Sequence, residues 1–137
     1  MIMTEIEGLA EIPLETVKRY QTMMNSLIRY QREDGLWSTV LDHPEYYAET
    51  SGSAGIACGI VKAVRQGLLN ASCLSSAYRT VEAILMRITP EGEVQEASGG
   101  TPIMPTVEDY NKIPCYPTLY GQGLVLMLLA EIWDISS

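Results

Sequence analysis

The side chains best suited to chemistry are gathered in one short stretch near the middle of the chain. The carboxylate of Glu49 is followed by the hydroxyl groups of Thr50, Ser51 and Ser53. Hydroxyls donate and accept hydrogen bonds, so this run suits a polar ligand at the start of a helix. The alternative is a structural role, with Ser51 as an N-cap, Ser53 as a small packing residue and Glu49 as a loop anchor or salt-bridge partner in place of an acid. Both interpretations stay open from the sequence.

A second set of candidates precedes the last apolar stretch of the chain. Tyr116, Tyr120 and Gly121 occupy the place there that Glu49 to Ser51 occupy in the first stretch. Trp37 lies in the loop between two predicted helices, where its ring could stack on a ligand or close the end of the core. For all these residues, ligand contact and packing remain alternatives.

Other kinds of site are not supported by the residue types. His43 is the sole histidine and lies beside Pro44 in a polar loop, where we expect it to face solvent. A single histidine without an adjacent nucleophile does not support a Ser/His or Cys/His triad. The three cysteines lack the close Cys/His spacing of a zinc site, so we expect buried or free thiols and a reducing, cytoplasmic compartment. We predict no cofactor and no metal.

Charge and length narrow the range of partners. The 137 residues suit one domain, residues 1–137, with a single core. A net charge of -8 repels phosphate backbones and anionic lipid, so nucleic acid and membrane surfaces are not expected partners. Residues 1–13 carry no positive side chain, unlike a secretory signal, and the apolar run 123–130 is too short to span a bilayer.

Hydrophobic periodicity predicts an all-α fold. Two segments have an apolar stripe and a wet face, residues 15–31 and 73–88, with Ser72 as the expected cap of the second. Two others are apolar on nearly all sides, residues 53–64 and 121–133. Residues 4–12 have the composition of a short additional helix that ends before Pro13.

The order of these segments is repeated. Gly35 and Gly92 each close a wet helix, and Trp37 and Val94 follow at the same offset before a long loop and a dry helix. Two stacked helical hairpins bury their dry helices in an inner layer, as in an α/α toroid or solenoid. The long loops would then gather over the N-termini of the inner helices, where amide groups and the helix dipole favour an anionic ligand.

In the same segments, the sequence resembles the C-terminal part of the unsaturated rhamnogalacturonyl hydrolases of glycoside hydrolase families 105 and 88. The resemblance covers about residues 14–131 as an ordered series of short motifs. These are Tyr30-Gln31, Asp34-Gly35-Leu36-Trp37, Tyr47-x-Glu49-Thr50-Ser51-x-Ser53-Ala54, Arg65-x-Gly67-x-Leu69, Gly92 with its strand-like turn, Tyr120-Gly121-x-Gly123 and Leu129-Ala130-Glu131.

The resemblance implies about five helices of an (α/α)6 toroid and an activity on pectin-derived oligosaccharides that end in an unsaturated galacturonyl residue. In that family an Asp hydrates the sugar double bond as general acid and base, unlike ordinary two-carboxylate hydrolysis. The hemiketal that forms then rearranges and releases the aglycone. The resemblance also implies that this Asp belongs to the N-terminal half, and no Arg-Gly-Asn-Gly-Trp-like segment precedes the helix at 15–31.

The resemblance implies that the candidate residues contact the sugar. These residues are Trp37, Thr50, Ser51, Ser53, Tyr116, Tyr120 and Gly121. Three interpretations follow: part of an unsaturated uronyl hydrolase that is inactive alone, a carbohydrate-binding or scaffold half-barrel without chemistry, or an enzyme whose site forms between subunits. An interrupted toroid leaves an apolar seam on its inner helices, so we expect homo-oligomers under all three.

Overall fold

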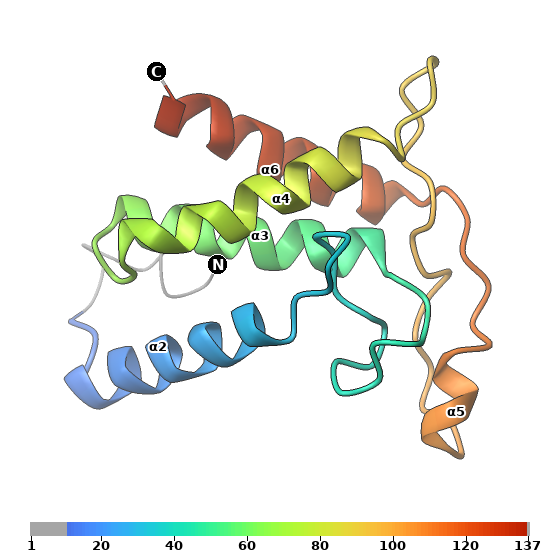
Figure 1. Ribbon diagram of the computed structural model, residues 1–137, viewed down its shortest axis with the longest axis horizontal. Coiled ribbons are helices and arrows are strands. Elements are labelled where there is room, and N and C mark those ends of the chain that lie inside the picture. Colours follow the sequence, from blue (N-terminus) through green and yellow to red (C-terminus); the bar gives the residue numbers. More distant parts are fainter. Residues whose placement is uncertain (1–10, 137) are drawn as a thin grey trace.

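The computed structural model describes residues 11–136, and its main elements are four long helices in two layers (Figure 1). These are α2 (Leu14–Arg29), α3 (Thr50–Arg65), α4 (Leu74–Leu85) and α6 (Leu119–Ser136). A short 3-10 helix, η1 (Ala71–Cys73), precedes α4, and a single turn, α5 (Val107–Tyr110), interrupts the second long loop. Pairing between strands is limited to isolated bridges within the described residues. The predicted all-α class is confirmed.

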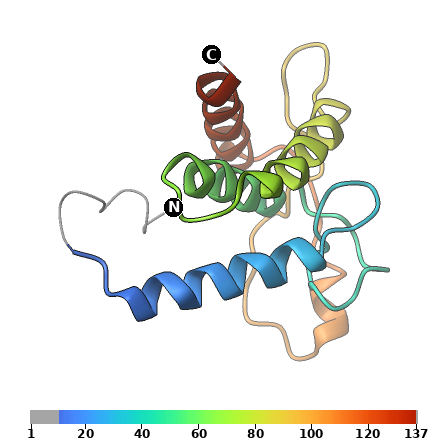
Figure 2. The same ribbon diagram turned by 60° about the vertical axis from the view of Figure 1, so that its left-hand side comes forward.

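The two layers follow the predicted division into dry and half-wet helices. The inner helix α3 contacts both α4 and α6, and most of its residues are buried. Each outer helix buries one stripe, which in α2 includes Tyr20 and Met24. The inner helices run opposite to α2 and α4, and both long loops emerge at one end of the molecule (Figures 1 and 2). The stacked hairpins are therefore present as expected.

Polar contacts join the first loop to α2 and the two inner helices to each other. The Trp37 indole N–H donates to the carbonyl of Leu27 at 2.6 Å, which joins the first loop to the end of α2. At the other end of α3, Glu131 of α6 lies 3.4 Å from Lys62 and 2.7 Å from Arg65. Glu131 is largely buried, so these ion pairs fix the inner helices against each other.

Several predicted boundaries need correction. Ser51 is not the cap of α3, because the carboxylate of Glu49 performs that task and Ser51 lies within the first turn. Ser72 is likewise not a cap: its backbone N–H donates to the side chain of Asn70, and α4 begins after η1 without a side-chain cap. The predicted helix at 4–12 falls almost wholly outside the described residues.

Only one side of α6 is buried. Gly121, Val125 and Leu128 are buried, but other apolar side chains of α6 face outward, with Leu119 94% and Trp133 76% exposed. A dry helix was predicted from residues 121–133, and its composition is indeed apolar on nearly all sides. Here it has one covered side and one uncovered side. No helix among residues 11–136 has both the length and the apolar character needed to cross a membrane.

Candidate functional site

Glu49 organises the end of the molecule where the loops gather. Its carboxylate accepts hydrogen bonds from the N–H of Ser51 at 3.2 Å and the N–H of Gly52. It also accepts from the Ser51 hydroxyl at 2.7 Å and from the N–H of Ser98 at 2.8 Å. The expected role of Glu49 as a loop anchor is confirmed, because one side chain caps α3 and holds the second long loop against it.

This capping changes what the start of α3 can bind. The first-turn amides of Ser51 and Gly52 already donate to a carboxylate of the protein, and that carboxylate complements the positive end of the helix dipole. An anionic ligand would have to displace Glu49 or lie beside it. The expectation that α3 offers unpaired amides to an anion is therefore wrong, and the site instead presents a carboxylate to which hydroxyl groups can donate.

A hollow of about 270 Å³ lies beside Glu49, between the first turns of α3 and α6. Tyr120, about half exposed, borders it from α6, and its hydroxyl donates to the carbonyl of Ser98. The lining residues come from both long loops and both inner helices: Thr39, Glu49, Ser51, Ser98, Gly100, Thr101 and Tyr120. Among them only Glu49 is charged, so the hollow is polar and rich in hydroxyl groups. We call it the inter-helix hollow.

Ser98 is the site residue that sequence reasoning missed. It lines the inter-helix hollow and is 6% exposed, and its hydroxyl has no hydrogen-bond partner. The hydroxyl of Thr50, fully buried nearby, is unpartnered as well, whereas its backbone N–H donates to Glu96 at 3.2 Å. Buried hydroxyls without partners are uncommon, because leaving them unpaired costs roughly 1–3 kcal/mol. They are the groups that a bound polar ligand could satisfy.

Two tyrosines hold the loop that carries Ser98. The hydroxyl of Tyr116 donates to Gly99 at 3.1 Å, next to the bond from Tyr120 to Ser98. Both rings are about half exposed and could contact a ligand as well as position the loop. Of the predicted sites, Ser51 and Tyr120 line the inter-helix hollow and Tyr116 supports it.

The remaining predicted residues lie deeper. Trp37 is 2% exposed and packs in the core, which leaves little surface for stacking on a ligand. The Ser53 hydroxyl accepts from the N–H of Trp37 at 2.9 Å and donates to the carbonyl of Glu49 at 2.6 Å. Gly121 packs so closely that an added Cβ would lie 2.9 Å from Cβ of Ala97. These residues, with Thr50, set the geometry around the hollow.

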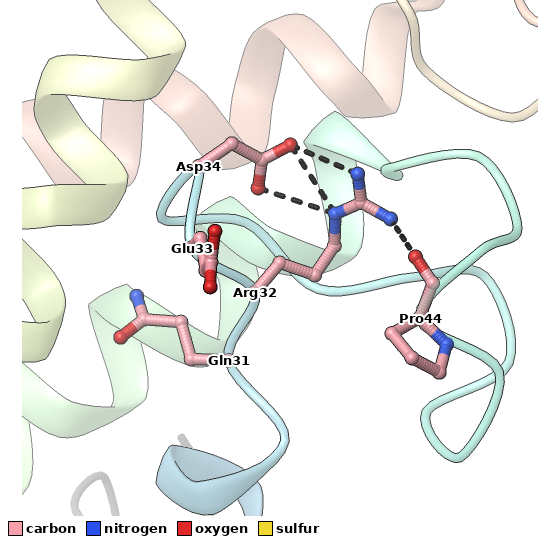
Figure 3. Close-up of a pocket in the computed structure, with 5 residues that line it drawn as sticks. All are labelled: Gln31, Arg32, Glu33, Asp34 and Pro44. Atoms are coloured by element: carbon pink, nitrogen blue, oxygen red, sulfur yellow. Dashed lines mark hydrogen bonds and ion pairs between the residues drawn. The ribbon is translucent and has the colours of Figure 1, made fainter.

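A larger hollow, of about 550 Å³, lies on the outer side of the first loop (Figure 3). Gln31, Arg32, Glu33, Asp34 and Pro44 line it. Arg32 forms an ion pair with Asp34 at 3.1 Å and donates to the carbonyl of Pro44, so its guanidinium is engaged in holding the loop. This arrangement explains the loop's shape and leaves the inter-helix hollow as the better candidate site.

The surroundings of Asp34 also set its acidity. Partial burial raises the pKa of this carboxyl, but hydrogen bonds from the Arg32 side chain and the Leu36 N–H, together with the nearby positive charges, outweigh it. The net result is a pKa below the ordinary aspartate value. Asp34 is thus an ionised structural partner of Arg32 at neutral pH, without the raised pKa of a general acid.

Within the described part of the chain, no group of three or more His, Cys, Asp or Glu side chains could hold a metal ion. His43 lies 2.9 Å from Glu45 and stacks on Tyr46 in the first loop, with 37% of its side chain exposed. The three cysteines are free, with Cys58 buried and Cys115 exposed. The polar side chains that line the inter-helix hollow carry hydroxyl groups and, at Glu49, a carboxylate.

The comparisons with known proteins agree with the family resemblance seen in the sequence. The family model for Glycosyl Hydrolase Family 88 matches residues 12–135. Over 113 residues, the chain is 37% identical to the unsaturated rhamnogalacturonyl hydrolase YesR of Bacillus subtilis (strain 168). That match covers 80% of this chain and 30% of the relative.

Solved structures extend the likeness to the fold. A possible member of the GH105 family from Salmonella enterica, serovar Paratyphi A, superposes with a TM-score of 0.91 at 32% identity. The match covers 98% of this chain and 36% of that one. Another possible GH105 member, from Klebsiella pneumoniae, gives a TM-score of 0.92 at 29% identity, with 100% and 38% covered. The helices thus form about a third of an (α/α)6 toroid, and the chain belongs to Glycosyl Hydrolase Family 88.

Proposed function

We propose that this chain forms part of the sugar-binding rim of an unsaturated rhamnogalacturonyl hydrolase, as the C-terminal part of the toroid. The substrate class follows from the relative described as an unsaturated rhamnogalacturonyl hydrolase. The observation that supports binding at the inter-helix hollow is the buried, unpartnered hydroxyl of Ser98 beside the carboxylate of Glu49. A hydroxyl-rich ligand can complete both groups at once.

The chemistry of the hollow favours a particular mode of binding. Sugar hydroxyls can donate to Glu49 and exchange hydrogen bonds with Ser98 and Ser51, while Tyr120 offers an aromatic face at the border. The sugar carboxylate would be repelled by Glu49 and should point away from it. The proposed contacts are therefore to neutral hydroxyl groups of an oligosaccharide that contains an unsaturated uronic acid.

We further propose that the chain alone does not catalyse the reaction. Glu49 accepts four hydrogen bonds from α3 and the second loop, so its position is fixed by structural contacts. No second carboxylate lines the inter-helix hollow within the described residues. The hydrating Asp implied by the family resemblance would come from the other part of the barrel. We also propose that the chain self-associates and that it is located in the cytoplasm.

Titration calorimetry with an unsaturated galacturonyl-rhamnose disaccharide tests the binding. Ser98→Ala removes a hydroxyl that has no partner in the free protein, so the thermal stability should change little. We expect the affinity to fall about five- to tenfold, the loss of one hydrogen bond. Ser75→Ala, on the exposed side of α4, is the matched control and should bind like the unaltered chain. Equal affinities for all three proteins would contradict the assigned site.

Ultraviolet absorbance of the sugar double bond separates the functional alternatives. Binding without loss of absorbance is the expected result for the chain alone. A half-barrel that only binds carbohydrate would give the same result. The two are distinguished by adding the other part of the barrel, which should restore turnover only if this chain is part of the enzyme. Steady loss of absorbance would instead favour an enzyme that completes its site between subunits, and would overturn the proposal of inactivity.

A further inference from the structure

Glu96 is the one residue other than glycine with a left-handed backbone among the described residues, with a φ of 59°. A side chain in this conformation costs free energy, because its Cβ lies close to the following carbonyl oxygen. Such outliers persist where surrounding contacts hold them, and they are concentrated at functional sites. Glu96 lies two residues before Ser98, which lines the inter-helix hollow.

Two contacts hold Glu96 in this conformation. Its carboxylate accepts from the Arg87 guanidinium at 2.6 Å, and Arg87 also donates to the carbonyl of Ala83 in α4 at 2.9 Å. The carbonyl of Glu96 accepts from the N–H of Thr50, the first residue of α3, at 3.2 Å. Glu96 therefore joins the end of the outer helix α4 to the first turn of the inner helix α3.

The residues that follow Glu96 are held by separate bonds. The carbonyl of Ala97 accepts from the N–H of Tyr116 at 2.9 Å, and the N–H of Ser98 donates to Glu49 at 2.8 Å. Neither bond engages the Ser98 hydroxyl, which is buried without a partner. A change of φ at Glu96 would rotate the chain that follows and move this hydroxyl relative to the inter-helix hollow.

We infer that Glu96 is a positioning residue for sugar binding, and that its carboxylate acts through the Ser98 hydroxyl without touching the sugar. The ion pair with Arg87 keeps the backbone left-handed, and that conformation fixes where the Ser98 hydroxyl meets a ligand. Glu96 and Arg87 line a separate hollow of about 370 Å³, so the carboxylate is not aimed at the bound sugar. The inference rests on the proposed function, because it assumes that sugar binds in the inter-helix hollow.

The exposure of the ion pair argues against a role in stability alone. The side chain of Glu96 is 56% exposed and that of Arg87 is 22% exposed. Exposed ion pairs add little to folding stability, and a left-handed backbone at a residue with a Cβ opposes folding. A glycine would adopt the same φ without that cost. A glutamate at this position therefore suits a requirement for fixed geometry better than a requirement for stability.

Three substitutions at Glu96 separate geometry from stability. Glu96→Ala removes the carboxylate and keeps the unfavourable backbone, Glu96→Gly removes both, and Glu96→Gln keeps an oxygen that can accept from Arg87. In titration calorimetry with the unsaturated galacturonyl-rhamnose disaccharide, Glu96→Ala and Glu96→Gly should bind about threefold to fivefold more weakly, part of the loss expected for Ser98→Ala. Glu96→Gln should recover most of the affinity. Glu96→Gly should nevertheless melt at or above the temperature of the unaltered chain.

Hydrogen exchange of the Ser98 amide gives a readout that needs no sugar. This N–H donates to Glu49, so a looser backbone at Glu96 should expose it more often. We expect several-fold faster exchange in Glu96→Ala than in the unaltered chain, and slower exchange again in Glu96→Gln. An exchange rate that Glu96→Ala leaves unchanged would overturn the inference.

A double-mutant cycle tests whether Glu96 acts through Ser98. In a Ser98→Ala background, Glu96→Ala should change the affinity by less than about twofold, because the group that it positions is gone. Glu93→Ala removes the same charge from an exposed position three residues earlier and should bind like the unaltered chain. An equal loss of affinity in both backgrounds, or no loss in either, would overturn the inference and leave the proposed function intact. An unaltered chain that does not bind the disaccharide would overturn both.

Discussion

The two helical hairpins are the same unit built twice. Gly35 and Gly92 lie in tight turns with φ values of 87° and 89°; they do not close the outer helices as predicted, because α2 ends at Arg29 and α4 at Leu85. Two residues later, the N–H of Trp37 donates to the side chain of Ser53, and the N–H of Val94 donates to the side chain of Gln122. Ser53 and Gln122 are each the fourth residue of an inner helix. The repeat seen in the sequence therefore extends to individual hydrogen bonds.

The two units differ in what covers them. Gly35 lies against α4 of the second unit, so that a Cβ there would be 2.5 Å from the carbonyl oxygen of Arg79. Gly92 has open space in the equivalent place. In the same way α3 is covered by α4 and α6, whereas α6 has an exposed face. In a stacked array each unit is stabilised by its neighbours, and the second unit lacks a following neighbour within the described residues.

The largest predicted effect comes from the two turn glycines. Gly35→Ala adds a clash with the backbone of α4 to the cost of a left-handed alanine, so we expect a loss of about 3 kcal/mol or more in unfolding free energy. Gly92→Ala has only the conformational cost, about 1 kcal/mol. Urea unfolding followed by circular dichroism measures both. Equal losses of unfolding free energy would show that the packing of Gly35 against α4 adds nothing to the cost of the substitution.

The caps of the inner helices give the next contrast. Glu49→Ala removes the acceptor for α3 and for the Ser98 N–H, and we expect it to cost about 2 kcal/mol of unfolding free energy. Thr118, whose hydroxyl accepts from the N–H of Gly121 at 3.0 Å, serves α6 alone, so Thr118→Ala should cost about 1 kcal/mol.

Thermal denaturation compares these two variants, with Glu49→Gln as the control that keeps the shape of the cap and removes its charge. The control should lie between the unaltered chain and Glu49→Ala. A Thr118→Ala chain less stable than Glu49→Ala would contradict the assigned importance of the carboxylate for the second loop.

The smallest effect concerns pH. The folded-state pKa of Asp34 is lowered, so the unfolded chain binds more protons here and the stabilisation is present above the unfolded pKa, about 3.9. It is lost as pH falls from there through the folded pKa. Asp34→Asn should flatten the dependence of unfolding free energy on pH in that acidic range only. The change should be modest because over a third of the side chain is exposed. A flattening near neutral pH would contradict this assignment.

Periodicity predicted the helices well because burial of an apolar stripe is a local pattern. The expected helix at 15–31 corresponds to α2, and the two dry segments correspond to α3 and α6. The caps were less predictable. Side chains suitable for capping are present at Ser51, Asn70 and Ser72, and only the three-dimensional contacts decide which of them accepts a hydrogen bond from a helix N–H. The turn α5 was missed because four residues carry no helical period.

The site was predictable only in part, because half of it comes from distant segments. Glu49, Ser51 and Tyr120 belong to motifs that the sequence singles out. Ser98 does not, since it lies in a Gly-rich loop and reaches Glu49 across 49 positions of the chain. Glu96, with a left-handed φ of 59°, likewise gives no local signal although its carbonyl receives the first N–H of α3.

The central claim is that sugar binds at the inter-helix hollow, between the first turns of the inner helices α3 and α6. Amide NMR spectra recorded during titration with the unsaturated galacturonyl-rhamnose disaccharide test it most directly. We predict saturable shifts at Ser51, Ser98, Gly100 and Thr101, and weaker binding in the Ser98→Ala chain. Shifts confined to Gln31, Arg32 and Asp34, at the larger hollow, would contradict the account, as would a spectrum that the sugar leaves unchanged.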